Sequence, residues 1–307
     1  MTYGFALFPG QGAQHPGMGK EVYEASAAAR AVFDCASQAA GLDVAQLCFS
    51  STLDELSRTI HSQIAIFTHS MAVYAALQEA GVTFSACAGF SLGEYTALAA
   101  AGVISLADAV QIVCKRGQVM QRAADAVEGG MAAVLGLDDA AVEQACAQVT
   151  DGLVRPVNYN CPGQLVIAGE RRAIEQAVQL CRQAGARRAV PLAVSGAFHT
   201  PLMQAAAAEL RDYLQSFTFS SPSMPVYSNL DGRPLQVDGL PEHLERHMVS
   251  PVRWKALMQN GLAAGLSTGC EIGPGKTLTG FAKKIDKSLS ITPVETMDDV
   301  RAASATA

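Results

Sequence analysis

Short apolar runs bounded by glycine alternate in this chain with longer segments of helical periodicity. The runs predicted to be buried strands are at residues 3–8, 86–90, 225–228, 269–272 and 288–294. The helical segments between them are at 21–40, 63–80, 92–101, 106–126, 201–216 and 241–247. Because strands that alternate with helices form parallel sheets covered by helices on both faces, the sequence predicts an α/β fold. The small, polar end of the chain, residues 298–307, is expected to fray.

The middle of the chain has a different order of elements. Its strand-like runs are at residues 131–137, 154–160, 164–169 and 186–194, and its helical segments are at 138–149 and 171–185. Strand–helix–strand–strand–helix–strand is the ferredoxin-like order, which closes a small core of its own. We therefore predict a larger α/β domain, formed by residues 1–126 and 196–307, with a ferredoxin-like subdomain at 127–195 inserted into it.

The composition excludes several classes of function. The 307 residues are 50% hydrophobic and 16% charged, which is typical of a globular chain with a large core. The net charge of −6 argues against nucleic-acid binding, which requires basic residues to neutralise phosphates. No apolar stretch approaches the ~20 residues that cross a bilayer. The eight cysteines are scattered without zinc-site spacing, so we expect free thiols, no metal and a cytoplasmic protein.

The segment GFSLG at residues 89–93 joins a predicted strand to a predicted helix. A G-x-S-x-G pattern in this context is typical of a nucleophile elbow, in which a strained turn exposes the serine. The first N–H groups of the helix then face any negative charge that forms beside Ser91. The alternative is that Ser91 caps an ordinary helix.

A nucleophilic serine needs a base, most often histidine. Of the six histidines, His199 follows a predicted strand and precedes a predicted helix. Catalytic groups lie at such strand ends in open α/β sheets. The pattern is equally compatible with a solvated histidine at a helix start, whereas His61 and His69 lie around an apolar helix and favour structural roles.

The loop FPGQGAQ at residues 8–14 follows the first strand, and its glycines leave backbone N–H groups free to bind an oxyanion. It does not match a dinucleotide-binding motif, because His15 stands where the third glycine is needed. The segment GKT at 275–277 resembles a phosphate-binding loop, but Cys270 replaces its required glycine.

The predicted helix at 106–126 carries three neighbouring basic residues, Lys115, Arg116 and Arg122. Arg116 lies on a partly apolar stripe, where a guanidinium needs an anionic partner. That partner is a protein carboxylate or a substrate carboxylate. Periodicity favours the protein carboxylate and does not choose among the three residues.

Together these segments resemble the malonyl-CoA:acyl-carrier-protein transacylases, a family of acyltransferases. The motifs that carry the resemblance run in order along nearly the whole chain: FPGQGAQ (8–14), GFSLGEYTAL (89–98), KRGQVMQ (115–121), NYNCPGQLVIAG (158–169), GAFHTPLM (196–203), SPVRW (250–254) and EIGPGKTLTGF (271–281).

The resemblance implies that Ser91 takes the acyl group as an ester and that His199 acts as base and then acid. It implies an oxyanion hole of the backbone N–H groups of Gln11 and Leu92, and makes Arg116 the group that binds the malonyl carboxylate. The implied fold is an α/β-hydrolase-like domain with a ferredoxin-like insert. The implied reaction moves malonyl from malonyl-CoA to the phosphopantetheine thiol of an acyl carrier protein, for fatty-acid elongation. We expect no cofactor, no membrane association and a monomer.

Two positions depart from the family pattern. Phe90 stands where histidine is common before the serine, and His247 stands where glutamine is usual. The family uses a main-chain carbonyl at the second position to orient the catalytic histidine, so His247 can still supply it. Near the C-terminus, lysines could contact an acidic carrier protein or only form a solvated helix face, at positions Lys276, Lys283, Lys284 and Lys287.

Other functions remain open at this point. The same fold and site serve free-standing acyltransferases of polyketide pathways and transferase subunits of malonate decarboxylases. A serine esterase or thioesterase would use water as the acceptor and would have no use for Arg116. The presence of Ser91, His199 and Arg116 together argues against a non-catalytic carrier-protein scaffold.

Overall fold

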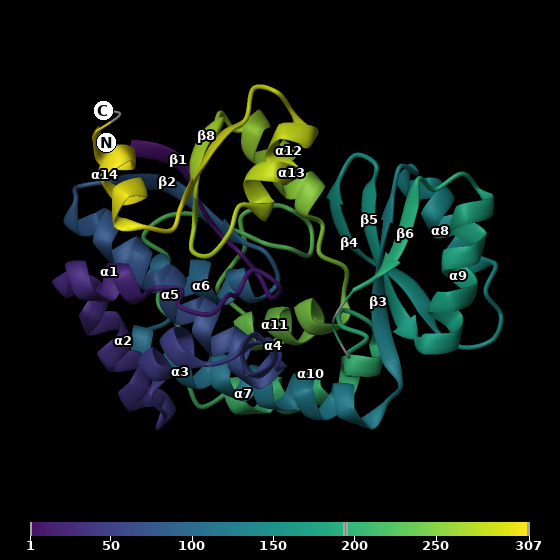
Figure 1. Ribbon diagram of the computed structural model, residues 1–307, viewed down its shortest axis with the longest axis horizontal. Helices are drawn as coiled ribbons and strands as arrows, with labels where there is room; N and C mark the ends of the chain where they lie inside the picture. Colours follow the sequence, from purple (N-terminus) through teal and green to yellow (C-terminus); the bar gives the residue numbers. More distant parts are fainter. Residues whose placement is uncertain (1, 193, 195, 306–307) are drawn as a thin grey trace.

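The computed structural model describes residues 2–192, 194 and 196–305 (Figure 1). Three predictions include positions outside this set: the end of the strand at 186–194, the domain limit at 195 and the last two residues of the tail.

The larger sheet has the strand order β7-β2-β1-β8-β9, and all its neighbouring strands are parallel. Its strands are β1 (Thr2–Phe8), β2 (Thr83–Gly89), β7 (Val226–Tyr227), β8 (Thr268–Ile272) and β9 (Ser290–Val294). Each overlaps a strand predicted from an apolar run, and the predicted parallel pairing is confirmed.

Helices cover both faces of this sheet, because side chains alternate along β1. Ala6 and Phe8 pack into the core formed with the long helix α5 (Thr59–Glu79), whereas Phe5 and Leu7 pack against the opposite face, under α12 (Trp254–Ala263) and α13 (Thr277–Ile285). The apolar run in β1 is continuous because both faces of this strand are buried.

The remaining elements of the larger part are α1 (Lys20–Ala25), α2 (Ala27–Ala40), α3 (Val44–Ser50), α4 (Leu53–Ser57), α6 (Leu92–Ala100), α7 (Leu106–Ala126), the 3-10 helix η1 (Pro201–Met203), α10 (Gln204–Leu214), α11 (Leu240–Val249) and α14 (Met297–Ala305). The predicted helix 21–40 is broken at Ser26, which has extended backbone and accepts a hydrogen bond from the N–H of Ala29 to cap α2. The sequence did not predict α3, α4, α12 or α13.

The prediction that the C-terminal tail frays is wrong as far as Ala305. Residues 297–305 form α14, which packs against α5 and buries Val300 and Ala303. The Tyr3 hydroxyl donates to the carbonyl of Ala303 at 3.1 Å. Tertiary burial thus holds a segment whose composition alone indicates disorder.

The second sheet is antiparallel, with the order β4-β5-β3-β6. Its elements are β3 (Gly129–Leu135), α8 (Asp139–Ala147), β4 (Val154–Cys161), β5 (Gln164–Glu170), α9 (Arg171–Gln183) and β6 (Arg188–Pro191). This is the predicted ferredoxin-like arrangement, with an apolar core that includes Val134 and Ile167. The domain limits, residues 1–126 with 196–307 and residues 127–195, stay a prediction.

Among the described residues, no helix combines the length and the apolar character required to span a bilayer.

Candidate active site

Ser91 lies in the turn between the end of β2 and the start of α6, with φ 53° and ψ −100°. Two close approaches require its flanking glycines. A Cβ atom on Gly89 would lie 1.9 Å from the carbonyl carbon of Gly93, and one on Gly93 would lie 2.2 Å from the carbonyl oxygen of Phe8. The Ser91 side chain makes no capping hydrogen bond to α6, all of which is described. The turn therefore has the geometry of a nucleophile elbow, and the helix-cap alternative does not apply.

His199 contacts the serine directly: its Nε2 lies 2.8 Å from Ser91 Oγ. Its Nδ1 lies 3.1 Å from the main-chain oxygens of both His247 and Ser250. Carbonyl oxygens only accept, so Nδ1 carries the proton and Nε2 is free to accept one from the serine. The predicted carbonyl of residue 247 is thus joined by a second one that the sequence did not indicate.

Burial lowers the pKa of His199 to about 3, and the neighbouring His247 and the positive charge of Arg116 contribute further lowering. The ring is therefore neutral near pH 7. A neutral imidazole aimed at a hydroxyl is the state that a general base requires.

Arg116, on α7, is 1% exposed and points into the same site. One guanidinium nitrogen donates to Gln63 Oε1 at 2.7 Å and another to Ser91 Oγ at 3.1 Å. The guanidinium carbon lies 5.0 Å from the centroid of the Tyr95 ring. Within the described part of the chain, no carboxylate forms an ion pair with Arg116. A buried cation without an anionic protein partner is suited to an anionic ligand.

The other two basic residues of α7 face elsewhere. Lys115 and Arg122 each form an ion pair with Glu209, at 2.6 Å in both cases. The structure therefore separates the three residues that periodicity could not distinguish, and only Arg116 reaches the serine.

The loop after β1 packs against the Ser91 turn. A Cβ atom on Gly10 would lie 2.5 Å from the carbonyl oxygen of Phe90, so this approach requires glycine. The backbone N–H groups of Gln11 and Leu92 donate no hydrogen bond to any residue that the structure describes. Both therefore remain available to an oxyanion beside Ser91.

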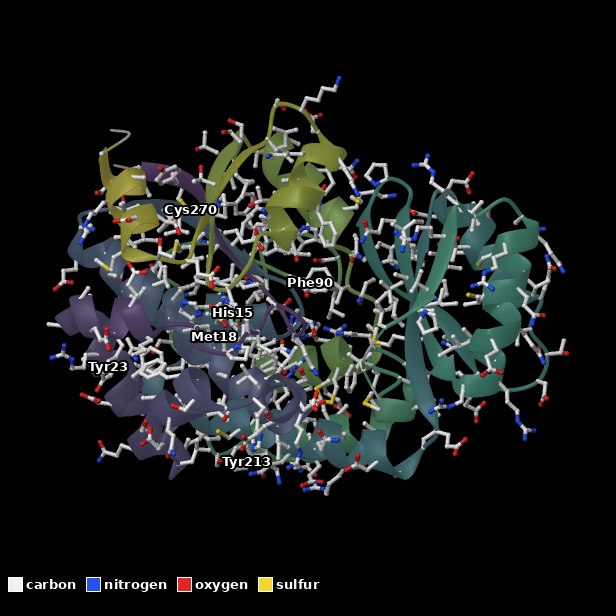
Figure 2. The ribbon with its side chains drawn as sticks, in the orientation of Figure 1. His15, Met18, Tyr23, Phe90, Tyr213 and Cys270 are labelled. Atoms are coloured by element: carbon white, nitrogen blue, oxygen red, sulfur yellow. The ribbon has the colours of Figure 1, made fainter. Side chains whose placement is uncertain are left out.

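The site opens through two adjoining hollows. A cavity of about 90 Å³ is lined by Ser91, Arg116 and His199, together with Gln11 and Phe90. A larger hollow of about 550 Å³ shares Gln11 and Phe90 and extends between the loop at 9–14, the antiparallel sheet and α13. Figure 2 shows Phe90 between the two sheets. Its ring packs against Trp254 and Phe281, with centroids 5.6 Å and 6.3 Å away.

Sequence reasoning missed the polar residues beneath the site. Gln63 binds Arg116, and Asn229 accepts a 2.7 Å hydrogen bond from the N–H of Ser91. Glu94 is fully buried and accepts a 2.7 Å hydrogen bond from the N–H of Asn229. The one available signal is positional, because Asn229 follows a short predicted strand and Glu94 lies in the first turn after the serine.

The described residues hold no cluster of three or more His, Cys, Asp or Glu side chains placed to bind a metal ion. All eight cysteines are described, none forms a disulfide, and none lines the cavity around Ser91.

Comparisons with known proteins agree with this geometry. Residues 5–303 match the acyl transferase domain family. The chain is 42% identical to the malonyl CoA-acyl carrier protein transacylase of Bacillus subtilis strain 168, over 95% of this chain and 94% of that protein. It is also 42% identical to the protein of that name from Escherichia coli K12, over 94% and 95% of the two chains.

Two solved structures are similar along their whole length. The acyl carrier protein S-malonyltransferase of Vibrio cholerae is 39% identical, with a TM-score of 0.93 over 98% of this chain and 99% of that one. A malonyl-transacylase solved in complex with a type II polyketide synthase acyl-carrier protein is 37% identical, with a TM-score of 0.96 over 100% of both chains.

Proposed function

This chain belongs to the malonyl CoA-acyl carrier protein transacylase family of acyl transferases, and we propose that Ser91, His199 and Arg116 carry its reaction. The protein transfers the malonyl group of malonyl-CoA to the phosphopantetheine thiol of an acyl carrier protein, which supplies fatty-acid elongation. The observation that carries the proposed roles is the 2.8 Å contact of Ser91 with a neutral His199, beside a buried arginine that also contacts the serine.

In the first half-reaction, Ser91 Oγ attacks the thioester carbonyl carbon while its proton passes to His199 Nε2. The tetrahedral oxyanion binds the N–H groups of Gln11 and Leu92. The carbon–sulfur bond then breaks, and His199 returns the proton to the thiol of coenzyme A. In the second half-reaction the carrier thiol gives its proton to His199 and attacks the ester carbonyl carbon. The bond between that carbon and Ser91 Oγ then breaks, and His199 returns the proton to Ser91 Oγ. Every proton has a carrier among these residues, so we propose that the reaction uses no cofactor.

Arg116 selects the acyl group. Its two terminal nitrogens, which bind Gln63 and Ser91, present N–H donors beside the serine, where they can bind the carboxylate of a serine-linked malonyl group. Acetyl-CoA offers no carboxylate, so the buried guanidinium favours malonyl over acetyl.

The hollow of about 550 Å³ provides space for the pantetheine arm, which coenzyme A and the carrier protein share. It is bounded on one side by Thr277, Leu278 and Phe281 of α13. Lys283 and Lys284 occupy the last turn of the same helix. We propose that these lysines attract an acidic carrier protein to the mouth of the hollow.

The protein is proposed to be a cytoplasmic monomer. The free state of its eight cysteines is consistent with a reducing compartment. Sedimentation of the purified protein would test the monomeric state, since a dimer would have twice the mass of 32.1 kDa.

Mass spectrometry after incubation with malonyl-CoA tests the reaction. We expect a malonyl adduct on Ser91 that forms without a carrier protein and disappears when holo-carrier protein is added. The Ser91→Ala variant should form no adduct. Release of free malonate without any thiol, at the rate of transfer, would instead identify an esterase.

A polyketide carrier protein is a second candidate acceptor, because a structural relative was solved with one. Transfer rates to a fatty-acid carrier and to a type II polyketide carrier, measured with the same acylated enzyme, would separate the two pathways.

A further inference from the structure

We propose that Asn229 is a positioning residue that holds the turn at Ser91, residues 89–93, together with His247, whose main-chain carbonyl orients the base His199. This inference rests on the proposed function. Its side chain is 0% exposed and uses all its polar atoms on this region. Oδ1 accepts from the N–H of Ser91 at 2.7 Å and from His247 Nε2 at 3.3 Å, while Nδ2 donates to the carbonyl oxygen of Gly89 at 2.7 Å.

The hydrogen bonds of Asn229 to Gly89 and Ser91 hold the turn in its strained conformation. Ser91 has φ 53°, a region that costs a non-glycine residue of order 1–3 kcal/mol unless its surroundings enforce it. The carboxamide of Asn229 binds the backbone on both sides of Phe90, at Gly89 and at Ser91. It therefore fixes the two peptide groups whose orientation directs Ser91 Oγ towards His199.

The hydrogen bond between Asn229 and His247 connects Asn229 to the base His199. Because Asn229 Oδ1 only accepts, the His247 ring must carry its proton on Nε2. The main-chain oxygen of the same residue lies 3.1 Å from His199 Nδ1. His199 itself has φ 62°, so it too needs external support. One amide oxygen thus holds both the nucleophile and the residue that orients its base.

Glu94 anchors this arrangement from below. Its carboxylate is 0% exposed, accepts the backbone N–H of Asn229 at 2.7 Å and contacts His243 Nε2 at 2.7 Å. Burial alone raises the pKa of Glu94, but His247, His243 and the Asn229 N–H together outweigh it, and the pKa lies below its usual value. A carboxylate on α6 therefore fixes the backbone of Asn229, and the Asn229 side chain fixes the turn that begins α6.

Two variants test the role of the carboxamide. Asn229→Ala removes all three side-chain hydrogen bonds, and we expect kcat to fall about 10²-fold with the KM for malonyl-CoA unchanged, because misplaced reacting groups cost about this much.

Asn229→Asp keeps the size and shape of the side chain. Its ionised form cannot donate to the Gly89 carbonyl, whereas its protonated form can, so its kcat relative to wild type should rise several-fold as the pH falls from about 8 to about 6.

That pH response separates positioning from a general loss of structure. The titratable or charged groups around the carboxamide are Glu94, His199, His243, His247 and Arg116. All are present in the wild type and in both variants, so a change of the rate ratio with pH reports the carboxyl group that Asn229→Asp introduces, together with its effect on these neighbours. Asn229→Ala should show a ratio that does not change with pH.

The matched control is Asn260→Ala, which also removes an amide that donates to a glycine carbonyl, at 2.9 Å on Gly232. We expect its kcat to stay within about twofold of wild type. Folding of each variant is checked by its thermal midpoint. The inference is overturned if folded Asn229→Asp keeps wild-type kcat at every pH, loses it equally at every pH, or changes only KM. If wild type itself forms no malonyl adduct on Ser91, the proposed function fails instead.

Discussion

The two sheets of this protein differ in what their interiors contain. The core of the antiparallel sheet consists of residues such as Ala132, Val134, Ile167 and Ala177, all apolar. Around Ser91, at the end of the parallel sheet, the buried side chains include charged and polar ones. These are Glu94, Arg116, Asn229 and His247, each at most 1% exposed. Burial of apolar side chains stabilises a fold, whereas burial of charges costs free energy unless each finds a partner. The core of the smaller region is thus built for stability, although Asn158 on its strand β4 lines the cavity at Ser91, and the edge of the larger region is built around chemistry.

The largest effect is expected from the apolar core. Ile167→Ala removes a 0% exposed side chain from the middle of β5, and should lower the free energy of unfolding by about 2–5 kcal/mol. Urea denaturation measures the loss. The kcat of the folded fraction should not change. A large fall in kcat without a fall in stability would break the comparison between the two regions.

Arg116→Ala tests the opposite region. Malonyl transfer should fall about 10²-fold or more, because the carboxylate loses its charged, hydrogen-bonded partner, while acetyl transfer should fall much less. Initial rates with the two coenzyme A esters measure the difference. Arg122→Ala, which removes a surface ion pair with Glu209, serves as the control. Equal losses for malonyl and acetyl would contradict the carboxylate role.

The histidines extend the comparison to pH. All six lie outside residues 127–195, and burial lowers the pKa of His69 and His247 to about 4 and that of His199 to about 3. Their ordinary value is 6.5, so below it the unfolded chain binds protons that the folded chain does not. Stability should therefore fall as the pH drops from 6.5 towards about 4, by up to about 1.4 kcal/mol per pH unit for each histidine.

Urea midpoints at several pH values measure this slope. His247→Gln keeps the main-chain carbonyl but removes one titrating ring, so its slope should be smaller by up to about 1.4 kcal/mol per pH unit. An unchanged slope would show that His247 does not titrate differently on folding.

The smallest effect is expected at the surface. Reversing both charges with Lys283→Glu and Lys284→Glu should raise the KM for an acidic carrier protein about three- to tenfold and leave the KM for malonyl-CoA unchanged. The difference should shrink at high salt, because exposed charges are screened. Lys20→Glu on α1, away from the residues that line the hollow, is the control. Unchanged carrier transfer would exclude these lysines from docking.

Sequence patterns predicted the elements whose signals lie within a short stretch of the chain. The strand–turn–helix around Ser91 and the order of elements along the ferredoxin-like unit both have such signals, and both were found. Helix α14 was missed because its stability comes from burying Val300 and Ala303 against distant elements. Periodicity likewise placed Arg116 on a partly apolar stripe but could not show that none of the described carboxylates forms an ion pair with it.

The polar support of the site could not be predicted for a similar reason. Asn229 binds Glu94 and Ser91 across separations of 135 and 138 residues. No periodic pattern links positions that far apart, and only the folded chain brings them together. The resemblance to a family supported the roles that local patterns had suggested for Ser91 and His199, but Asn229 and Gln63 lie outside the shared motifs and received no role.

The strand order of the parallel sheet also affects how the protein is made. Strand β1 pairs with β2 on one side and with β8 on the other, and β8 lies near the end of the chain. While the ribosome is still synthesising the middle of the protein, one edge of β1 has no partner although its side chains suit a strand buried on both faces. Such an edge invites pairing with other chains. The newly made protein therefore passes through a period of aggregation risk that ends only when residues 268–272 of β8 have emerged and can pair with β1.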